Sequence, residues 1–73
     1  MFSFNPLWKT LIDKNMTKTD LRLKTGISPS TLASMSKNEY VALSIIDKIC
    51  NVLDCKIEDV IEYKKGDIKN VIW

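Results

Sequence analysis

Gly26 is the residue that most constrains how this chain of 73 residues can fold. Thr17 is a strong helix N-cap, and Asp20, three residues later, completes an acidic capping box. A helix that begins there can end at Gly26, because glycine adopts the left-handed conformation of a helix end without steric cost. Ser28 is then a second N-cap, and Pro29 a first helical residue whose missing N–H loses nothing. The pattern predicts two short helices joined by a sharp turn.

Apolar residues at fixed distances from this turn favour one kind of helix pair. Leu21 lies five residues before Gly26, Ile27 follows it directly, and Leu32 and Met35 lie six and nine residues after it. A generic helical hairpin, which remains the alternative from spacing alone, does not need all four. The set is typical of a helix-turn-helix motif over residues 17–37, whose second helix can enter a DNA major groove.

The motif and its surroundings together resemble the Cro/C1-type (Xre-like) helix-turn-helix domain of phage repressors and small bacterial regulators. The run Leu7-Trp8-Lys9-Thr10-Leu11-Ile12 resembles the first helix of that family. Residues 43–54 and 55–60 resemble its fourth and fifth helices. The resemblance implies an all-α, lambda-repressor-like fold of five helices in one domain, residues 1–73, with a short strand pair between the two termini as an option.

The resemblance also implies a sequence-specific transcriptional regulator, in the first instance a repressor, that binds double-stranded DNA as a homodimer. Helix 29–36 would lie in the major groove, with the two half-sites about 34 Å apart. The residues expected at bases or nearby phosphates are Lys18, Ser28, Pro29, Ser30, Thr31 and Ser34. Those expected at the DNA backbone are Lys37, Asn38 and Tyr40, and for Tyr40 packing against the core is an equal alternative.

Two departures from the family pattern affect what the motif can read. The position that is usually a small alanine between the two helices is Arg22, whose aliphatic stem could cover the same surface. The second helix also lacks the Gln, Asn or Arg side chains that make bidentate base contacts. An alternative function is therefore a protein-interaction module of the same fold, an antirepressor or regulatory partner without its own operator.

Charge is concentrated in the half of the chain that carries the motif. The net charge is only +2, from 11 basic and 9 acidic residues. Between residues 9 and 39 six basic residues face three acidic ones, whereas from residue 40 onward five face six. A basic surface of this kind suits phosphate, although a solvated lysine face is the alternative.

The remaining residues exclude several other function classes. The chain has no histidine and no Cys-x-x-Cys pair, and Cys50 and Cys55 are interpreted as buried or half-buried thiols. We expect no metal site, no cofactor and no enzymatic activity, because no reactive cysteine environment or glycine-rich loop is evident. No secretory signal or membrane-spanning run is apparent, so the expected location is the cytoplasm.

The flanking segments complete the expected helices. We expect Asn5 to cap a first helix that uses Leu7, Trp8, Leu11 and Ile12 as its core face, and Ser44 to cap the fourth helix. A fifth helix is predicted over residues 57–62. The tail, residues 67–73, carries Ile68, Val71, Ile72 and Trp73. It is expected to pack, either as a strand against residues 2–4 or across a partner subunit, and it is our candidate for the dimer contact.

Overall fold

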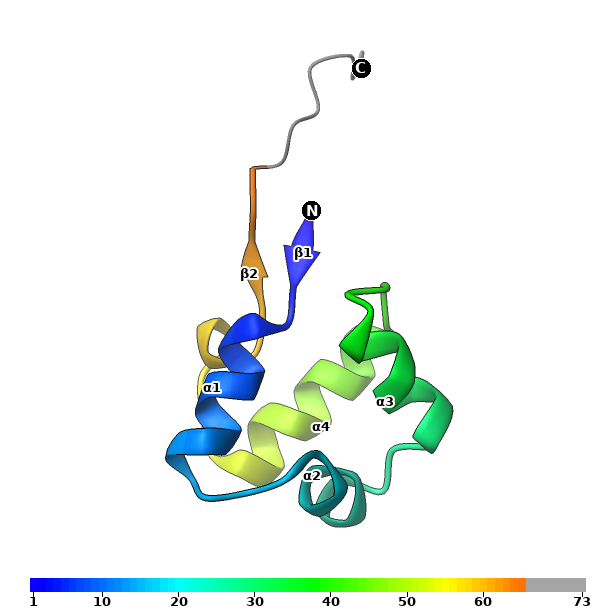
Figure 1. Ribbon diagram of the computed structural model, residues 1–73, viewed down its shortest axis with the longest axis vertical. Helices are drawn as coiled ribbons and strands as arrows, with labels where there is room; N and C mark the ends of the chain where they lie inside the picture. The colour runs from blue at the N-terminus through cyan, green and yellow to red at the C-terminus, as the bar shows by residue number, and fades with distance from the viewer. Residues whose placement is uncertain (66–73) are drawn as a thin grey trace.

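The computed structural model describes residues 1–65, which form four helices, a short 3₁₀ helix and a two-stranded ribbon (Figure 1). The helices are α1 (Asn5–Asp13), α2 (Lys18–Thr25), α3 (Pro29–Ser36) and α4 (Leu43–Leu53), followed by the 3₁₀ helix η1 (Ile57–Asp59). The strands are β1 (Phe2–Ser3) and β2 (Glu62–Tyr63). The expected tail, residues 67–73, lies outside the described residues.

Helix α4 is the centre of the core. Its buried residues Ile46, Ile49 and Leu53 recur at the three- and four-residue spacing of one helix face. In Figure 1 this helix crosses the molecule between α1 and α3. The side chains that meet it in the buried core are Phe4, Leu7, Leu11, Leu21, Ile27, Met35 and Val60. One small core therefore connects the helices, and α3 meets it through the single buried side chain of Met35.

The prediction of five α-helices is wrong by one, because the segment after α4 makes only the three-residue turn η1. Thr10 on α1 donates a hydrogen bond of 2.8 Å to the carbonyl oxygen of Asp59, an acceptor that a continuing helix would use itself. The chain enters β2 at Glu62, three residues after the end of η1. Within this stretch Val60 is buried, whereas Ile57 in η1 is exposed.

The expected strand pair is present, and within residues 1–65 the partner of β1 is β2. Phe2 lies opposite Tyr63 and Ser3 opposite Glu62 in antiparallel register. The pairing extends to Lys64, whose N–H donates to the carbonyl oxygen of Met1 at 2.7 Å. Residues 62–64 therefore pair along the N-terminal strand.

Three smaller predictions about the helices are also wrong. Helix α1 begins at Asn5 with Phe4 as its N-cap, and α4 begins at Leu43 with Ala42 as its N-cap, so neither Asn5 nor Ser44 is the cap residue. Ile12 is 74% exposed, because it lies about 100° around the helix from buried Leu11. At α4, packing against the core sets the residue at which the helix begins, and the capping preference of Ser44 does not override it.

Candidate nucleic-acid interface

The first half of the motif has the local structure that its sequence predicts. The Thr17 hydroxyl accepts a hydrogen bond from the Asp20 N–H at 3.1 Å, and the Asp20 carboxylate accepts one from the Thr17 N–H at 2.9 Å. The backbone hydrogen bond from Thr17 lowers the pKa of Asp20. Gly26 ends α2 in the left-handed region at φ +74°, and Arg22 is half-buried beside the turn.

The N-terminus of α3 carries a cluster of hydroxyl groups. Ser28 caps the helix by accepting a hydrogen bond from the Thr31 N–H at 3.1 Å. The Ser28 hydroxyl oxygen also lies 3.0 Å from that of Ser30 and 2.9 Å from that of Thr31. Pro29 is exposed at the first helical position. The cap confirms the predicted start of the second helix, whose buried residue is Met35.

An open cleft of about 300 Å³ separates α3 from the segment that leads into α4. Of the sequence-predicted contact residues it brings together Ser30, Thr31, Ser34 and Tyr40, and its remaining lining residues are Val41, Ala42 and Ile45. The Tyr40 side chain is 82% exposed, and its ring meets Phe2 edge to face at a centroid distance of 6.4 Å. The alternative in which Tyr40 packs into the core is therefore wrong.

Two further predicted contact residues, Lys18 and Asn38, form hydrogen bonds with distant parts of the chain. The Lys18 ammonium donates to the Ser36 hydroxyl at 3.1 Å and lies 4.2 Å from the centroid of the Trp8 ring. The side-chain oxygen of Asn38 accepts a hydrogen bond from the Phe4 N–H at 3.0 Å. Sequence reasoning missed Ser36, Trp8 and Phe4 as partners, because they are distant in sequence and no local pattern links them.

The outward part of the predicted site consists of exposed Ser28, Ser30 and Lys37, with the half-buried hydroxyls of Thr31 and Ser34 beside them. Lys37 is exposed at the C-cap of α3. Serine and threonine hydroxyls can donate to phosphate oxygens or to base acceptors, and a lysine ammonium can neutralise a phosphate. This face therefore offers hydroxyl groups, one exposed ammonium and small side chains that let a helix approach a ligand closely.

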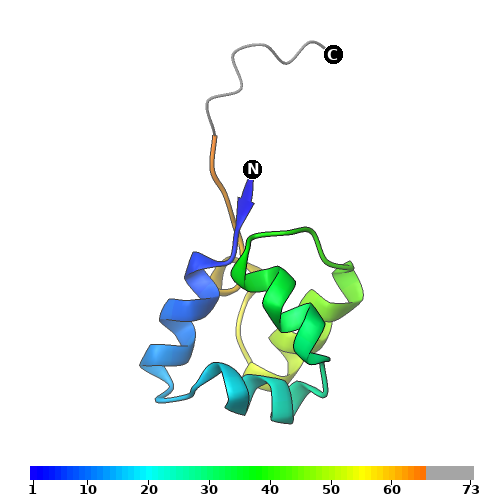
Figure 2. The same ribbon diagram turned by 45° about the vertical axis from the view of Figure 1, so that its right-hand side comes forward.

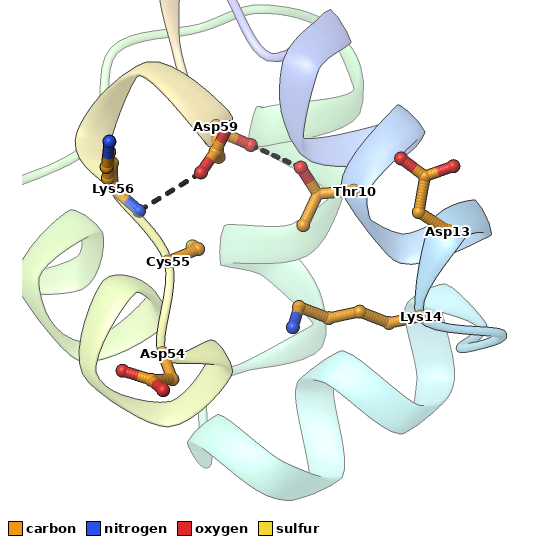
Figure 3. Close-up of a pocket in the computed structure, with 7 residues that line it drawn as sticks. All are labelled: Thr10, Asp13, Lys14, Asp54, Cys55, Lys56 and Asp59. Atoms are coloured by element: carbon orange, nitrogen blue, oxygen red, sulfur yellow. Dashed lines mark hydrogen bonds between the residues drawn. The ribbon is translucent and has the colours of Figure 1, made fainter.

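A second hollow lies between the C-terminal part of α1 and the segment after α4 (Figure 3). Its volume is about 670 Å³, and its lining residues are Thr10, Asp13, Lys14, Asp54, Cys55, Lys56 and Asp59. Burial raises the pKa of the Cys55 thiol, and nearby Cys50 and Asp59 raise it further. A raised pKa lowers the fraction of the thiol that is present as thiolate.

The described residues hold neither a cluster of metal ligands nor a membrane-spanning helix. Among residues 1–65 no three His, Cys, Asp or Glu side chains gather closely enough to hold a metal ion. None of the helices in that range combines the length and the apolar character that a bilayer crossing requires.

Comparisons with known proteins agree with this geometry. Residues 6–66 match the family model of the Cro/C1-type HTH DNA-binding domain. The chain is also similar to the crystal structure of the transcriptional regulator VanUg, with 48% sequence identity and a TM-score of 0.81. That match covers 84% of this chain and 81% of the other. No curated protein matches the chain significantly.

Proposed function

This chain belongs to the family of Cro/C1-type helix-turn-helix DNA-binding domains, and from this premise we propose that it is a sequence-specific transcriptional regulator of double-stranded DNA. Helix α3 enters the major groove, and the protein acts as a repressor by occupying its operator. The observation that carries this proposal is the outward face of α3, where Ser30, Thr31 and Ser34 line an open cleft with Tyr40. The similarity to a transcriptional regulator supports the same reading.

The small side chains of α3 suit close approach to the bases. Ser30 and Ser34 are four residues apart and so lie on one helix face. Their hydroxyls, with those of Ser28 and Thr31, reach base edges or the adjacent phosphates. Pro29 offers only apolar contact, for instance to a thymine methyl group.

Residues beside α3 hold the DNA backbone. Lys37 contacts one phosphate at the C-terminal end of the helix, and the Tyr40 hydroxyl contacts another from the loop that follows. Lys14 and Lys24, both exposed, add long-range attraction. The excess of three positive charges between residues 9 and 39, six basic against three acidic residues, supports this orientation.

The protein works in the cytoplasm as a homodimer. Two copies bind half-sites about one helical turn, roughly 34 Å, apart, so the operator has approximate two-fold symmetry. The tail, residues 67–73, supplies the dimer contact, since its four large apolar side chains need a partner surface.

A gel shift at low salt against random duplex DNA is the first test, followed by selection of bound duplexes from a random pool. We expect non-specific binding that weakens as salt is raised, and a selected site with two half-sites. Failure to bind any duplex at low salt would instead favour the interaction module, for which exposed Tyr40 and Leu43 would be the contact surface.

The double variant Ser30→Ala/Ser34→Ala locates the contact surface. We expect its affinity for the selected duplex to fall about tenfold or more, because each lost hydrogen bond is worth about 1 kcal/mol. Ser44→Ala, which changes an exposed serine on α4, is the matched control and should bind like the parent protein. Equal affinity of the parent protein, the double variant and Ser44→Ala would contradict the proposal that α3 lies in the groove.

A further inference from the structure

We propose that Lys18 is a positioning residue, which holds the C-terminal end of α3 against α1, and that its ammonium does not contact a DNA phosphate. The proposal rests on the proposed use of α3 as the groove-binding helix. It reverses the expectation from the sequence, in which Lys18 is one of the DNA contacts.

The contacts of Lys18 join three helices. The residue begins α2, its ammonium donates to Ser36 at the last residue of α3, and the same ammonium lies over the ring of Trp8 on α1. A cation 4.2 Å from a ring centroid is within the range of a favourable cation–π contact. The half-buried Trp8 ring is itself packed against the core, so it gives the ammonium a fixed platform.

The position of Lys18 in α2 argues that these contacts matter. A cation at the first residue of a helix faces the positive end of the helix dipole, which is unfavourable. The ammonium is directed away from the helix axis onto Trp8 and Ser36, and both contacts offset that cost. Trp8 belongs to α1 and Ser36 to α3, so each contact joins α2 to another helix.

A second contact secures the same end of α3. Asn38, two residues beyond the helix, accepts a hydrogen bond from the Phe4 N–H at the junction of β1 and α1. Figure 2 shows the C-terminal end of α3 directed toward this junction. Lys18 and Asn38 thus tie the end of α3 to the N-terminal part of the chain at two separate points.

Helix α3 needs such ties because its own packing is slight. It has eight residues, and Met35 is its one buried side chain, with Leu32 packed at the edge of the core. Its N-terminal end is fixed by the Gly26 turn and buried Ile27. Without the ties the helix can pivot about that end, and DNA binding then has to order it.

The experiment compares Lys18→Met with Lys24→Met in DNA binding across a salt series. Both variants remove one positive charge from an exposed position on α2. We expect Lys18→Met to weaken binding about threefold to tenfold at every salt concentration, with an unchanged slope of log affinity against log salt. Lys24→Met should have a smaller effect. Lys18→Arg, which keeps a cation that stacks on tryptophan, should restore binding.

Amide hydrogen exchange provides a readout that needs no DNA. The amides to follow are those of Lys37, Asn38 and Glu39, which donate to carbonyls within α3. We expect faster exchange there in Lys18→Met, and in Ser36→Ala, than in the parent protein. If Lys18→Met does not fold, Ser36→Ala tests the same contact at an exposed site.

The outcomes separate the two proposals. A salt slope that falls by about one with unchanged exchange would identify Lys18 as a phosphate contact and overturn the positioning role. Unchanged affinity and exchange would overturn it as well. If the parent protein binds no duplex, the proposed function fails, while exchange at the end of α3 still decides whether Lys18 holds it.

Discussion

At the scale of single residues, Asn38 has two structural roles, one through its backbone and one through its side chain. Its backbone is left-handed, at φ +56°, a region that asparagine tolerates better than most residues. Its side-chain oxygen accepts the hydrogen bond from Phe4. The side-chain NH₂ group is a separate donor that this hydrogen bond does not use.

Substitution of Asn38 should separate these roles. We expect Asn38→Ala to lower the free energy of unfolding by about 2 kcal/mol, roughly half from the lost hydrogen bond and half from left-handed strain. Asn38→Gly should lose about 1 kcal/mol less than the alanine variant. Asn38→Asp keeps the hydrogen-bond acceptor and the tolerance of a left-handed backbone, so its free energy of unfolding should stay near that of the parent protein. Urea unfolding checks the order, and equal values for Ala and Asp would refute it.

Asp20 should make α2 sensitive to acid. Its pKa is lowered in the folded protein, so the carboxylate adds stability above its unfolded pKa of about 4. That stability is lost as pH falls through the lower folded value. We expect Asp20→Asn to lose less stability between pH 6 and pH 3 than the parent protein does, as measured by urea midpoints. Parallel losses in the two proteins would exclude the capping box as the source.

At the scale of elements, local signals predicted the motif well, and tertiary contacts explain where prediction failed. The bounds of α2 and α3 follow from Thr17, Gly26, Ser28 and Pro29, each of which acts on its own neighbours. The prediction of a fifth helix was wrong where the Asp59 carbonyl accepts a hydrogen bond from Thr10, a residue 49 positions away in sequence. No short-range pattern contains a contact of that kind.

The candidate site divides in the same way. Ser30, Thr31 and Ser34 share a face because helical spacing places them there, so sequence alone predicts their grouping. Lys18, at the start of the second helix, was predicted to contact bases or nearby phosphates from the resemblance to the family. Its actual partners depend on how α1 and α3 pack against α2, which the sequence does not state locally.

The Gly26 turn gives the sharpest test at this scale. A Cβ atom at this position would meet nothing within 4 Å, so the cost of a side chain comes from the left-handed backbone and not from a clash. We expect Gly26→Ala to lower the free energy of unfolding by about 1–2 kcal/mol. Gly26→Asn should cost less, since asparagine visits this region more readily. Thermal unfolding of both variants checks this, and a larger loss for asparagine would contradict it.

At the scale of the whole molecule, a chain of 73 residues leaves much apolar surface uncovered. Phe2, Tyr40, Leu43 and Tyr63 are all exposed. The rings of Phe2 and Tyr63 meet edge to face at a centroid distance of 5.4 Å, and Phe2 also meets Tyr40, so these aromatics are contiguous across the ribbon and the loop before α4. A patch of this kind, with an apolar tail following Lys65 in sequence, is typical of a self-associating protein.

The tail is the part of the chain whose removal should separate association from folding. Because ten buried hydrophobic residues between Phe4 and Val60 already form a core, we expect a protein trimmed of residues 68–73 to fold. We expect it to sediment as a monomer, while the full chain sediments as a dimer. Lys69→Ala, which removes a charge from the tail but no apolar side chain, should remain dimeric. The trimmed protein should bind a single half-site with the same affinity as the full chain. On a site with two half-sites it should bind more weakly than the full chain, because its two copies are no longer linked. A trimmed protein that sediments like the intact one would place the dimer contact elsewhere, with the exposed aromatics of the ribbon as the next surface to change.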